Sequence, residues 1–308
     1  MKIALVQTYH PYTQMTHLHP LGLMYVATGA RRGGYEDISI LDMKTEDMRV
    51  PAAAAWLEER RPDVIGLTAM TYEAGCLHSL AAEMKKRLPG VVIVAGGPHP
   101  SVAADDVMKD TNVDFCVRGE GEITFPALLD AIRAGCRDFT DVVGVVWRRE
   151  NGEVVLNPDR VPPDSLDELG FPAWDLIDNR RYYSVPRGGI IYAHKEFATI
   201  FSSRACPWRC TYCHNSYGKK FRERSSRHVL EEIDMLVTKM GVRELVFYDD
   251  IFNFKPDRAK AICRGLVERK YDLKLTFPNG LRGDILDEEL VDLMKDAGMY
   301  RAMIAIES

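Results

Sequence analysis

The sequence predicts an α/β protein in which a Rossmann-like domain is followed by a partial (β/α) barrel. Short apolar runs alternate with segments of helical periodicity in residues 1–135 and again in residues 196–308. A length of 308 residues exceeds what a single core usually supports, which indicates two domains. Near-continuous Val and Ile runs with helices between them are typical of parallel sheets that are covered on both faces.

Residues 1–135 hold the expected strands and helices of the Rossmann-like domain. Apolar periodicity marks the helices, and the pair Gly33-Gly34 is a helix stop signal. Strands are expected at residues 2–7, 38–41, 64–68, 91–95 and 114–117, and helices at residues 21–33, 52–60 and 77–88.

Residues 136–195 have a different character. The pair Asn151-Gly152 separates two β-like runs, residues 142–148 and 153–156, which predicts a hairpin. Proline then becomes frequent, at Pro158, Pro162, Pro163, Pro172 and Pro186. We interpret this stretch as a linker that wraps between the domains.

Strand–helix alternation resumes at Phe197 and predicts four β/α repeats. Strands are expected at residues 198–202, 244–248, 273–277 and 302–306, and helices at residues 227–240, 256–270 and 287–297. In such a barrel the functional residues gather at the C-terminal ends of the strands.

The composition is that of an ordinary globular protein, with 46% apolar and 28% charged residues. A formal net charge of -5 gives no electrostatic case for nucleic-acid binding. No run of about 18 apolar residues is present to span a bilayer, and the brief apolar N-terminal run does not fit a signal peptide. We therefore expect a cytoplasmic protein that acts on a small-molecule substrate.

Three of the seven cysteines, Cys206, Cys210 and Cys213, crowd into eight residues after a predicted strand. In a reducing compartment such a group indicates metal binding rather than a disulfide. Three thiolates can bind three irons of a cubane cluster and leave the fourth iron open, and an open position distinguishes a reactive site from a structural one. The alternatives are a zinc site completed by His214, directly beside Cys213, and three unrelated buried cysteines.

The Cys-x3-Cys-x2-Cys spacing, with Tyr212 before the last cysteine, resembles the radical S-adenosylmethionine (radical SAM) superfamily. The resemblance implies a [4Fe-4S] cluster held by these cysteines, with S-adenosylmethionine chelating the open iron. It also implies that the reduced cluster cleaves the cofactor and that the resulting 5′-deoxyadenosyl radical abstracts hydrogen from the substrate. An external electron donor of the flavodoxin or ferredoxin type would supply the electron.

Polar residues also follow the other predicted barrel strands. Asp249 and Asp250 follow the second strand, where the family places acceptors for the methionyl amine, and a carboxylate suits an ammonium group. The alternative for this pair is a surface turn or a helix cap. A turn that ends in Arg282 resembles the family's substrate- or cofactor-facing turn. Glu307 and Ser308 end the fourth strand, where the family binds ribose hydroxyls.

Three loops of small and polar residues follow strands of the first domain. Small residues at strand ends let a ligand approach the backbone, and the crevice there is the usual binding site of open α/β sheets. With residues 20–23, these loops resemble the cobalamin-binding domain that is joined to many radical SAM enzymes, and they imply that residues 1–135 bind cobalamin. The residues concerned are Thr68, Met70, Thr71, Gly96, Gly97, His99, Gly119 and Glu120.

One departure from the cobalamin-binding pattern concerns histidine. Cobalamin mutases carry Asp-x-His-x-x-Gly, whose histidine ligates cobalt, and this sequence lacks that motif. His99 is then either a ligand contact or a plain turn residue. The alternative for the whole domain is an empty Rossmann-like scaffold that positions the substrate.

Together the resemblances imply a cobalamin-dependent radical methyltransferase that acts on an unactivated carbon. The alternatives are radical cyclisation or rearrangement, a non-catalytic protein that binds cobalamin or a cluster, and a zinc-stabilised scaffold. The family core usually has six β/α units, whereas this sequence predicts four. We therefore expect either a chain truncated at its C-terminus or a partner chain that covers the open barrel edge.

Overall fold

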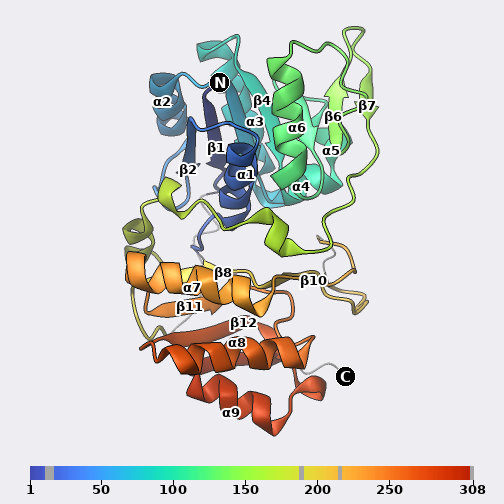
Figure 1. The fold of residues 1–308 in the computed structure, drawn as a ribbon. Helices are drawn as coiled ribbons and strands as arrows, with labels where there is room; N and C mark the ends of the chain where they lie inside the picture. The colour runs from blue at the N-terminus through green and yellow to red at the C-terminus, as the bar shows by residue number, and fades with distance from the viewer. Residues whose placement is uncertain (11–16, 187–190, 214–216, 306–308) are drawn as a thin grey trace. The chain divides into compact units, whose positions relative to one another are not determined.

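A computed structural model describes residues 1–10, 17–186, 191–213 and 217–305, and the chain divides into two compact units (Figure 1). Unit 1 comprises Met1–Pro162 and Phe171–Gly188, and unit 2 comprises Pro163–Gly170 and Gly189–Ser308. The short segment Pro163–Gly170 therefore groups with unit 2, although the chain on both sides of it groups with unit 1.

Unit 1 is built on a seven-stranded sheet of order β2-β1-β3-β4-β5-β6-β7. Strands β1 to β5 are parallel, and the hairpin β6–β7 extends the sheet in antiparallel fashion. The strand order reverses between β1 and β3, which creates the switch point of a doubly wound fold. The strands are β1 (Ile3–Gln7), β2 (Ile38–Asp42), β3 (Val64–Thr68), β4 (Val92–Gly96), β5 (Phe115–Val117), β6 (Val145–Arg148) and β7 (Val154–Leu156).

Helices pack on both faces of this sheet. Helices α1 (Leu21–Arg32) and α6 (Gly121–Arg133) share one apolar core with the strands, and α2 (Val50–Arg60) and α3 (Ala74–Arg87) share the other. The short helices α4 (Pro98–Val102) and α5 (Ala104–Val107) follow β4. The doubly covered parallel sheet confirms the predicted Rossmann-like class.

Helix α6 was not among the predicted helices, and it contains a proline, Pro126, in its interior. Proline has no N–H to donate to the carbonyl of Glu122, four residues earlier. Gly29 of α1 packs against that carbonyl, and a Cβ at Gly29 would lie 2.0 Å from its oxygen. A side chain at Gly29 would therefore force the two helices apart.

The segment after Phe171 is part of unit 1 and forms two 3-10 helices, η3 (Trp174–Leu176) and η4 (Asn179–Ser184). The Tyr182 hydroxyl donates to Asp42 at the end of β2, at 2.9 Å. The His19 ring lies against the Tyr182 ring with centroids 4.3 Å apart. Trp174 and Tyr182 are both buried, so they pack the segment onto unit 1.

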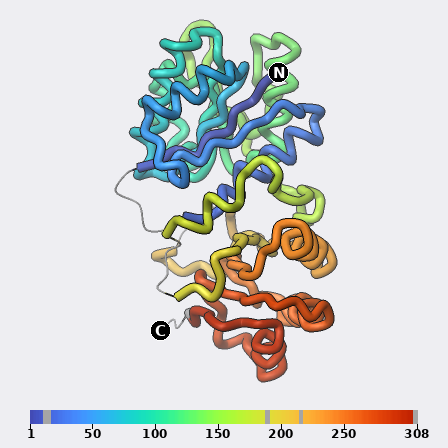
Figure 2. The backbone as a smooth tube through the Cα atoms, turned by 90° about the vertical axis from the view of Figure 1, so that its left-hand side faces the viewer, coloured from blue at the N-terminus to red at the C-terminus, as the bar shows by residue number. Residues whose placement is uncertain are grey.

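Unit 2 is built on a parallel sheet of order β13-β12-β11-β8, with a helix between successive strands. The elements are β8 (Phe197–Ile200), α7 (Ser226–Met240), β11 (Glu244–Phe247), α8 (Pro256–Arg269), β12 (Lys274–Arg282), η5 (Gly283–Ile285), α9 (Glu288–Asp296) and β13 (Met299–Ala305). The three helices lie side by side on one face of the sheet (Figures 1 and 2). These four strands, with the helices between them, confirm the predicted partial barrel.

One predicted feature of unit 2 is wrong. Residues 279–282 were expected to form a turn after the third strand, but they belong to β12. The register between β12 and β13 shifts between Phe277 and Leu281, and Gly280 has φ +104°. The strand is thus interrupted by an irregularity at a glycine and then continues.

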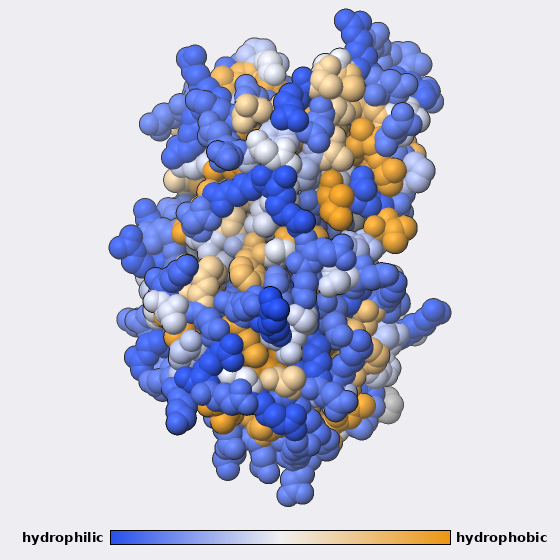
Figure 3. Space-filling view, viewed as in Figure 1, coloured by the Kyte–Doolittle hydropathy of each residue, from blue (hydrophilic) through white to orange (hydrophobic). Residues whose placement is uncertain are grey.

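The molecular face shown in Figure 3 is mostly hydrophilic, with apolar side chains in separate patches. None of the helices within the described ranges combines the length and the apolar character needed to cross a bilayer.

Candidate functional site

The three cysteines lie on a loop that is closed at its base as a hairpin. Strand β9 (Ser203–Arg204) pairs antiparallel with β10 (Arg222–Glu223), so the loop between them starts and ends at one place. The hairpin follows β8 directly, so it leaves the C-terminal edge of the parallel sheet. This edge is where barrel folds carry their functional residues.

The cysteine side chains differ in exposure. Cys206 and Cys210 are half-buried, whereas Cys213 is exposed, and the Cys213 N–H donates to the Cys210 carbonyl at 3.2 Å. Burial raises the pKa of the Cys206 thiol, and the backbone N–H of Trp208, which donates to that thiol, opposes the effect. The preceding residue, Ala205, has φ +69°, a left-handed conformation that is uncommon for a residue with a Cβ.

The zinc alternative needs four ligands around one ion. Within the ranges that the structure describes, no three Cys, His, Asp or Glu side chains gather closely enough to hold one metal ion. His214, the fourth ligand of the zinc alternative, lies outside the described residues.

Asp249, which follows β11, holds the start of the hairpin. Its carboxylate accepts hydrogen bonds from the Ser202 N–H at 3.1 Å, the Ser202 hydroxyl at 2.7 Å and the Ser203 hydroxyl. The residue is only 2% exposed. The carboxylate predicted to accept a ligand's ammonium group therefore faces the hairpin base. Asp250 is half-buried, and its charge adds to the effect of burial in raising the pKa of Cys206.

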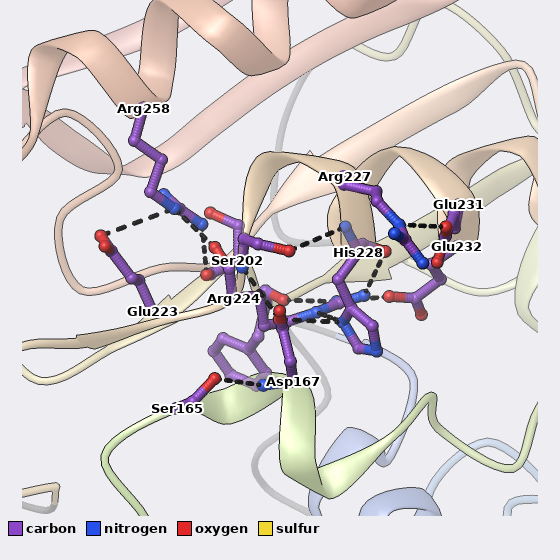
Figure 4. A network of polar contacts seen from close by, with 12 residues as sticks. Ser165, Asp167, Ser202, Glu223, Arg224, Arg227, His228, Glu231, Glu232 and Arg258 are labelled. Carbon is purple, nitrogen blue, oxygen red and sulfur yellow. Dashed lines mark hydrogen bonds and ion pairs between the residues drawn. The ribbon is translucent and has the colours of Figure 1, made fainter.

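Arg258 of α8 ties the two ends of the hairpin together (Figure 4). Its Nε donates to the Arg224 carbonyl at 2.7 Å, and its Nη2 donates to the Ser202 carbonyl. The Arg224 N–H donates to that same Ser202 carbonyl at 3.0 Å. The Glu223 carboxylate lies 3.6 Å from Arg258 Nε. The buried Arg258 guanidinium thus contacts the residue before β9, the residue after β10 and a carboxylate of β10.

The exit of the hairpin is held by the segment Pro163–Gly170. Ser165 forms a β-bridge with Glu223, and the Asp167 carboxylate accepts from the Ser225 N–H at 2.8 Å. Arg224 forms a buried ion pair with Glu232 of α7. The base is thus fixed from α7, from α8 and from a segment far away in sequence.

Arg282, at the end of β12, lies against the cysteine loop. Its guanidinium stands 4.6 Å from the centroid of the Trp208 ring, and it forms two hydrogen bonds with Asp284. Tyr212 is 74% exposed. Glu307 and Ser308, predicted at the end of the fourth strand, lie outside the described residues.

Ser202, Ser203 and Arg258 were not singled out from the sequence. The two serines carry a usable signal, because polar residues that follow an apolar strand are placed at the functional edge of a parallel sheet. Arg258 carries none, since nothing local distinguishes it from the other arginines of α8.

The structure brings together the three strand-end loops of unit 1, residues 68–71, 96–101 and 117–122. The His99 N–H donates to the Ala69 carbonyl at 3.0 Å, which joins the first two loops. The Ser101 hydroxyl donates to the Gly97 carbonyl and accepts from the Gly119 N–H, which joins the second to the third. These loops therefore form one continuous polar edge beside the switch point of the sheet.

Residues of these loops suit a broad ligand. Met70 is 42% exposed, and Thr71 is also exposed, whereas Thr68 and Glu120 are half-buried. The side chains of Tyr72, in the 3-10 turn Thr71–Glu73, and of Val102, the last residue of α4, are also exposed. The small residues of these loops leave room for a ligand to approach the backbone. Gly96 ends β4 within this edge.

Two glycines of these loops have left-handed backbones. Gly97 has φ +89°, and a Cβ there would lie 2.1 Å from the Thr68 hydroxyl oxygen. Gly119 has φ +70° and would meet nothing within 4 Å. Gly97 is therefore required by packing, whereas the space at Gly119 is open to a ligand.

His99 is half-buried, and its Nδ1 atom has no hydrogen-bond partner among the residues described. Burial lowers the pKa of this imidazole, and the nearby His78 lowers it further. The ring is thus neutral near pH 7, the form that accepts a hydrogen bond or binds a metal.

Comparison with known proteins identifies both parts of the chain. The model of the B12 binding domain matches residues 15–129, and the model of the Radical SAM superfamily matches residues 200–308. An uncharacterized methyltransferase of Pyrococcus horikoshii is 31% identical over 94% of this chain and 61% of its own length. An anaerobic magnesium-protoporphyrin IX monomethyl ester cyclase of Rubrivivax gelatinosus is 26% identical over 94% of this chain and 52% of its own length.

Among solved structures, the cobalamin-dependent S-adenosylmethionine radical enzyme OxsB, with aqua-cobalamin and S-adenosylmethionine bound, has the same fold. The TM-score is 0.79 at 19% identity, over 100% of this chain and 44% of OxsB. The chain thus spans about 60% or less of the length of these relatives. With both family models matched in this order, the chain consists of a B12-binding domain followed by a domain of the Radical SAM superfamily.

Proposed function

We propose that this chain is the cofactor-binding part of a cobalamin-dependent radical SAM methyltransferase that methylates an unactivated carbon of a small molecule. One observation carries the proposal: a three-cysteine loop, closed at its base as a hairpin, leaves the C-terminal edge of a parallel β/α sheet in a chain that also has a B12-binding domain. Residues 1–135 would serve cobalamin, residues 196–308 the radical chemistry, and residues 136–195 the connection.

The residues have distinct proposed roles. Cys206, Cys210 and Cys213 would hold a [4Fe-4S] cluster. When bound, the cluster and S-adenosylmethionine supply a carbon-centred radical, and cobalamin supplies the methyl group. Asp249 and Arg258 would keep the loop in place. The residues proposed to contact S-adenosylmethionine are Tyr212, Asp250, Arg282, Glu307 and Ser308, and those proposed to contact cobalamin are Thr68, Met70, Thr71, Gly96, Gly97, His99, Gly119 and Glu120.

A second candidate is radical ring closure, and it has a specific observation in its favour. The similarity to the Rubrivivax cyclase covers as much of this chain as the similarity to the Pyrococcus methyltransferase. Mass spectrometry of the product separates the two reactions, because only methylation adds a carbon atom.

The decisive experiment is anaerobic reconstitution of the chain with iron and sulfide. We expect about four irons and four sulfides per chain, and 5′-deoxyadenosine after reduction with S-adenosylmethionine. Cys210→Ala should abolish both, whereas Cys136→Ala, at an exposed cysteine outside the loop, should leave both unchanged. Production of 5′-deoxyadenosine by the Cys210→Ala variant would show that the assignment is wrong.

Three further points belong to the proposal. An external one-electron donor of the flavodoxin or ferredoxin type would reduce the cluster. A cytoplasmic location follows from the reducing compartment that such a cysteine group needs. The edge strand β13 exposes the apolar side chains of Met303 and Ile304, and an exposed apolar edge strand tends to pair with another chain. We therefore also propose that a partner chain covers this edge.

A further inference from the structure

A guanidinium from β12 lies on the cysteine loop beside two of the proposed cluster ligands. The Arg282 guanidinium stands 4.6 Å from the centroid of the Trp208 ring, and Trp208 lies between Cys206 and Cys210 in sequence. The Arg282 side chain is 22% exposed, so this contact is partly shielded from solvent. A shielded charge acts on its neighbours more strongly than one in bulk water.

Hydrogen bonds hold both the backbone and the guanidinium of Arg282. Its backbone N–H donates to the Asn253 side-chain oxygen at 3.0 Å, and the Asn253 amide donates back to the Arg282 carbonyl at 2.9 Å. Asn253 is fully buried. The guanidinium forms a two-bond fork with Asp284, at 2.8 and 2.7 Å. The charge therefore has a defined place.

Trp208 is held from its other side. Its ring packs edge-on against Phe254, at 5.3 Å between centroids, and Phe254 packs on Phe221 at 4.7 Å. The backbone N–H of Trp208 donates to the sulfur of Cys206. The contact with Arg282 thus steadies a residue whose N–H points at a proposed ligand.

The Arg282 guanidinium also interacts electrostatically with two of the cysteines. Hydrogen bonds to Asp284 are the main reason that the pKa of Arg282 is raised, and the Cys210 and Cys206 thiols raise it further. Positive charge and N–H donors near the sulfurs of an iron–sulfur cluster favour its more negative, reduced form.

We propose that Arg282 raises the reduction potential of the cluster held by the cysteine loop and that Asp284 partly offsets this effect. The inference rests on the proposed function, since it needs a cluster in the loop. The step concerned is uptake of one electron by the cluster from an external one-electron reductant, with no bond made or broken in the protein.

The test is an anaerobic potentiometric titration of the reconstituted full chain, followed by electron paramagnetic resonance of the reduced cluster. Arg282→Met should shift the midpoint potential to a more negative value, and Asp284→Asn should shift it to a more positive value. Arg269→Met is the matched control, because Arg269 forks onto Asp234 with the same geometry, at 2.6 and 3.0 Å, at the opposite end of α8 from the strand ends that carry the loop. It should leave the potential unchanged.

Opposite shifts in the two variants are the key result, since a purely structural role gives no reason for the sign to reverse. Equal potentials in Arg282→Met and the wild type, or an equal shift in Arg269→Met, would overturn the inference. If Arg282→Met binds no iron, the Asp284→Asn variant alone tests the inference. A midpoint potential of Asp284→Asn that equals that of the wild type, or is more negative, would then overturn the inference. A wild-type chain that assembles no cluster contradicts the proposed function itself, and the iron assay identifies that case.

Discussion

At the scale of single residues, Asp249 is the carboxylate on which the cysteine hairpin depends. Burial raises the pKa of this carboxyl, while the Arg258 guanidinium and the Ser202 and Ser203 hydroxyls oppose that effect. A buried carboxylate is tolerable when donors and an opposite charge surround it, as they do here. Asp249 therefore has a structural task that is independent of any cofactor.

This task can be measured without a cofactor. Asp249→Asn keeps the shape but removes the charge and turns an N–H₂ toward the serine groups, so it should lower the free energy of unfolding of the metal-free protein by about 3 kcal/mol. Urea denaturation followed by circular dichroism gives this value.

The matched control is Asp272→Asn. Asp272 is also paired with an arginine, Arg243, but its side chain is 73% exposed, so the change should be below about 1 kcal/mol. If Asp249→Asn lowers the stability of the metal-free protein no more than the control does, the Asp249 carboxylate has no structural task. It is then available to accept a ligand's ammonium group, as predicted from the sequence.

At the scale of elements, the start of α7 depends on an uncharged histidine. Arg224 Nε donates to His228 Nδ1 at 2.9 Å, so Nδ1 carries no proton, and the Asp167 carboxylate at 3.4 Å from it is not an ion-pair partner. Burial and then Arg224 lower the pKa of His228, against the smaller opposing effects of Asp167, Glu232 and Glu231. Protonation would break this contact, one of those that join the hairpin exit to the helix.

The sign of the pH dependence follows from this shift. The folded pKa lies below the unfolded value of about 6.5, so the folded state binds fewer protons in that range. The contribution of His228 to stability should be complete above about pH 6.5 and should be lost as the pH falls through the folded pKa. Denaturation at several pH values should show this slope in the wild type.

His228→Asn, whose side-chain oxygen can replace Nδ1 as an acceptor, supplies the comparison. The difference in unfolding free energy between wild type and variant should shrink or reverse toward low pH, whereas a constant difference from pH 8 to 5 would contradict the neutral-histidine assignment. The pKa of His99 is also lowered, but His99 is present in both proteins, so its contribution to the pH dependence cancels in the difference.

Elements with a strong local signal were predictable, and those set by tertiary contacts were not. The parallel strands of unit 1 carry near-continuous Val and Ile runs, so their places follow from the sequence. Helix α6 was not predicted. An internal proline such as Pro126 locally disfavours a helix, and packing of α6 against α1 outweighs this local preference. The two-residue ribbon β9–β10 is too short for any periodicity to reveal it.

The candidate site divides in the same way. The cysteines were identified from spacing within eight residues, which is local information. The hydrogen bond between Ser202 and Asp249 joins positions 47 residues apart, and the hydrogen bond from Arg258 to the Ser202 carbonyl spans 56 residues. Such contacts exist only once the parallel sheet has brought the strand ends to one edge, and no single-sequence pattern encodes them.

At the scale of the whole molecule, two units carry two separate groups of candidate residues. A ligand that binds only the folded form of one unit stabilises that unit by mass action, by about 2.7 kcal/mol at a hundredfold excess over Kd. Loading of the cluster should therefore slow amide hydrogen exchange in the peptides of β8, β11 and β12 of unit 2. Added cobalamin should slow exchange around residues 68–71, 96–101 and 117–122 of unit 1. Peptide-level mass spectrometry resolves both.

The Cys210→Ala variant is the control for the first effect, because it should lose protection by iron and sulfide but keep protection by cobalamin. Protection of residues 68–71 by iron and sulfide alone, or none in unit 2, would contradict the assignment of cofactors to units.

The hairpin closure at β9–β10 also bears on how quickly a metal could be captured. Joining the ends of a flexible stretch costs entropy that rises with its length, and here the pairing of β9 with β10 joins them through the protein's own backbone. Once one cysteine holds iron, the other two thiols meet it as tethered groups. Their effective concentration is then on the order of millimolar, set by the length of residues 205–221 and not by the amount of protein in solution.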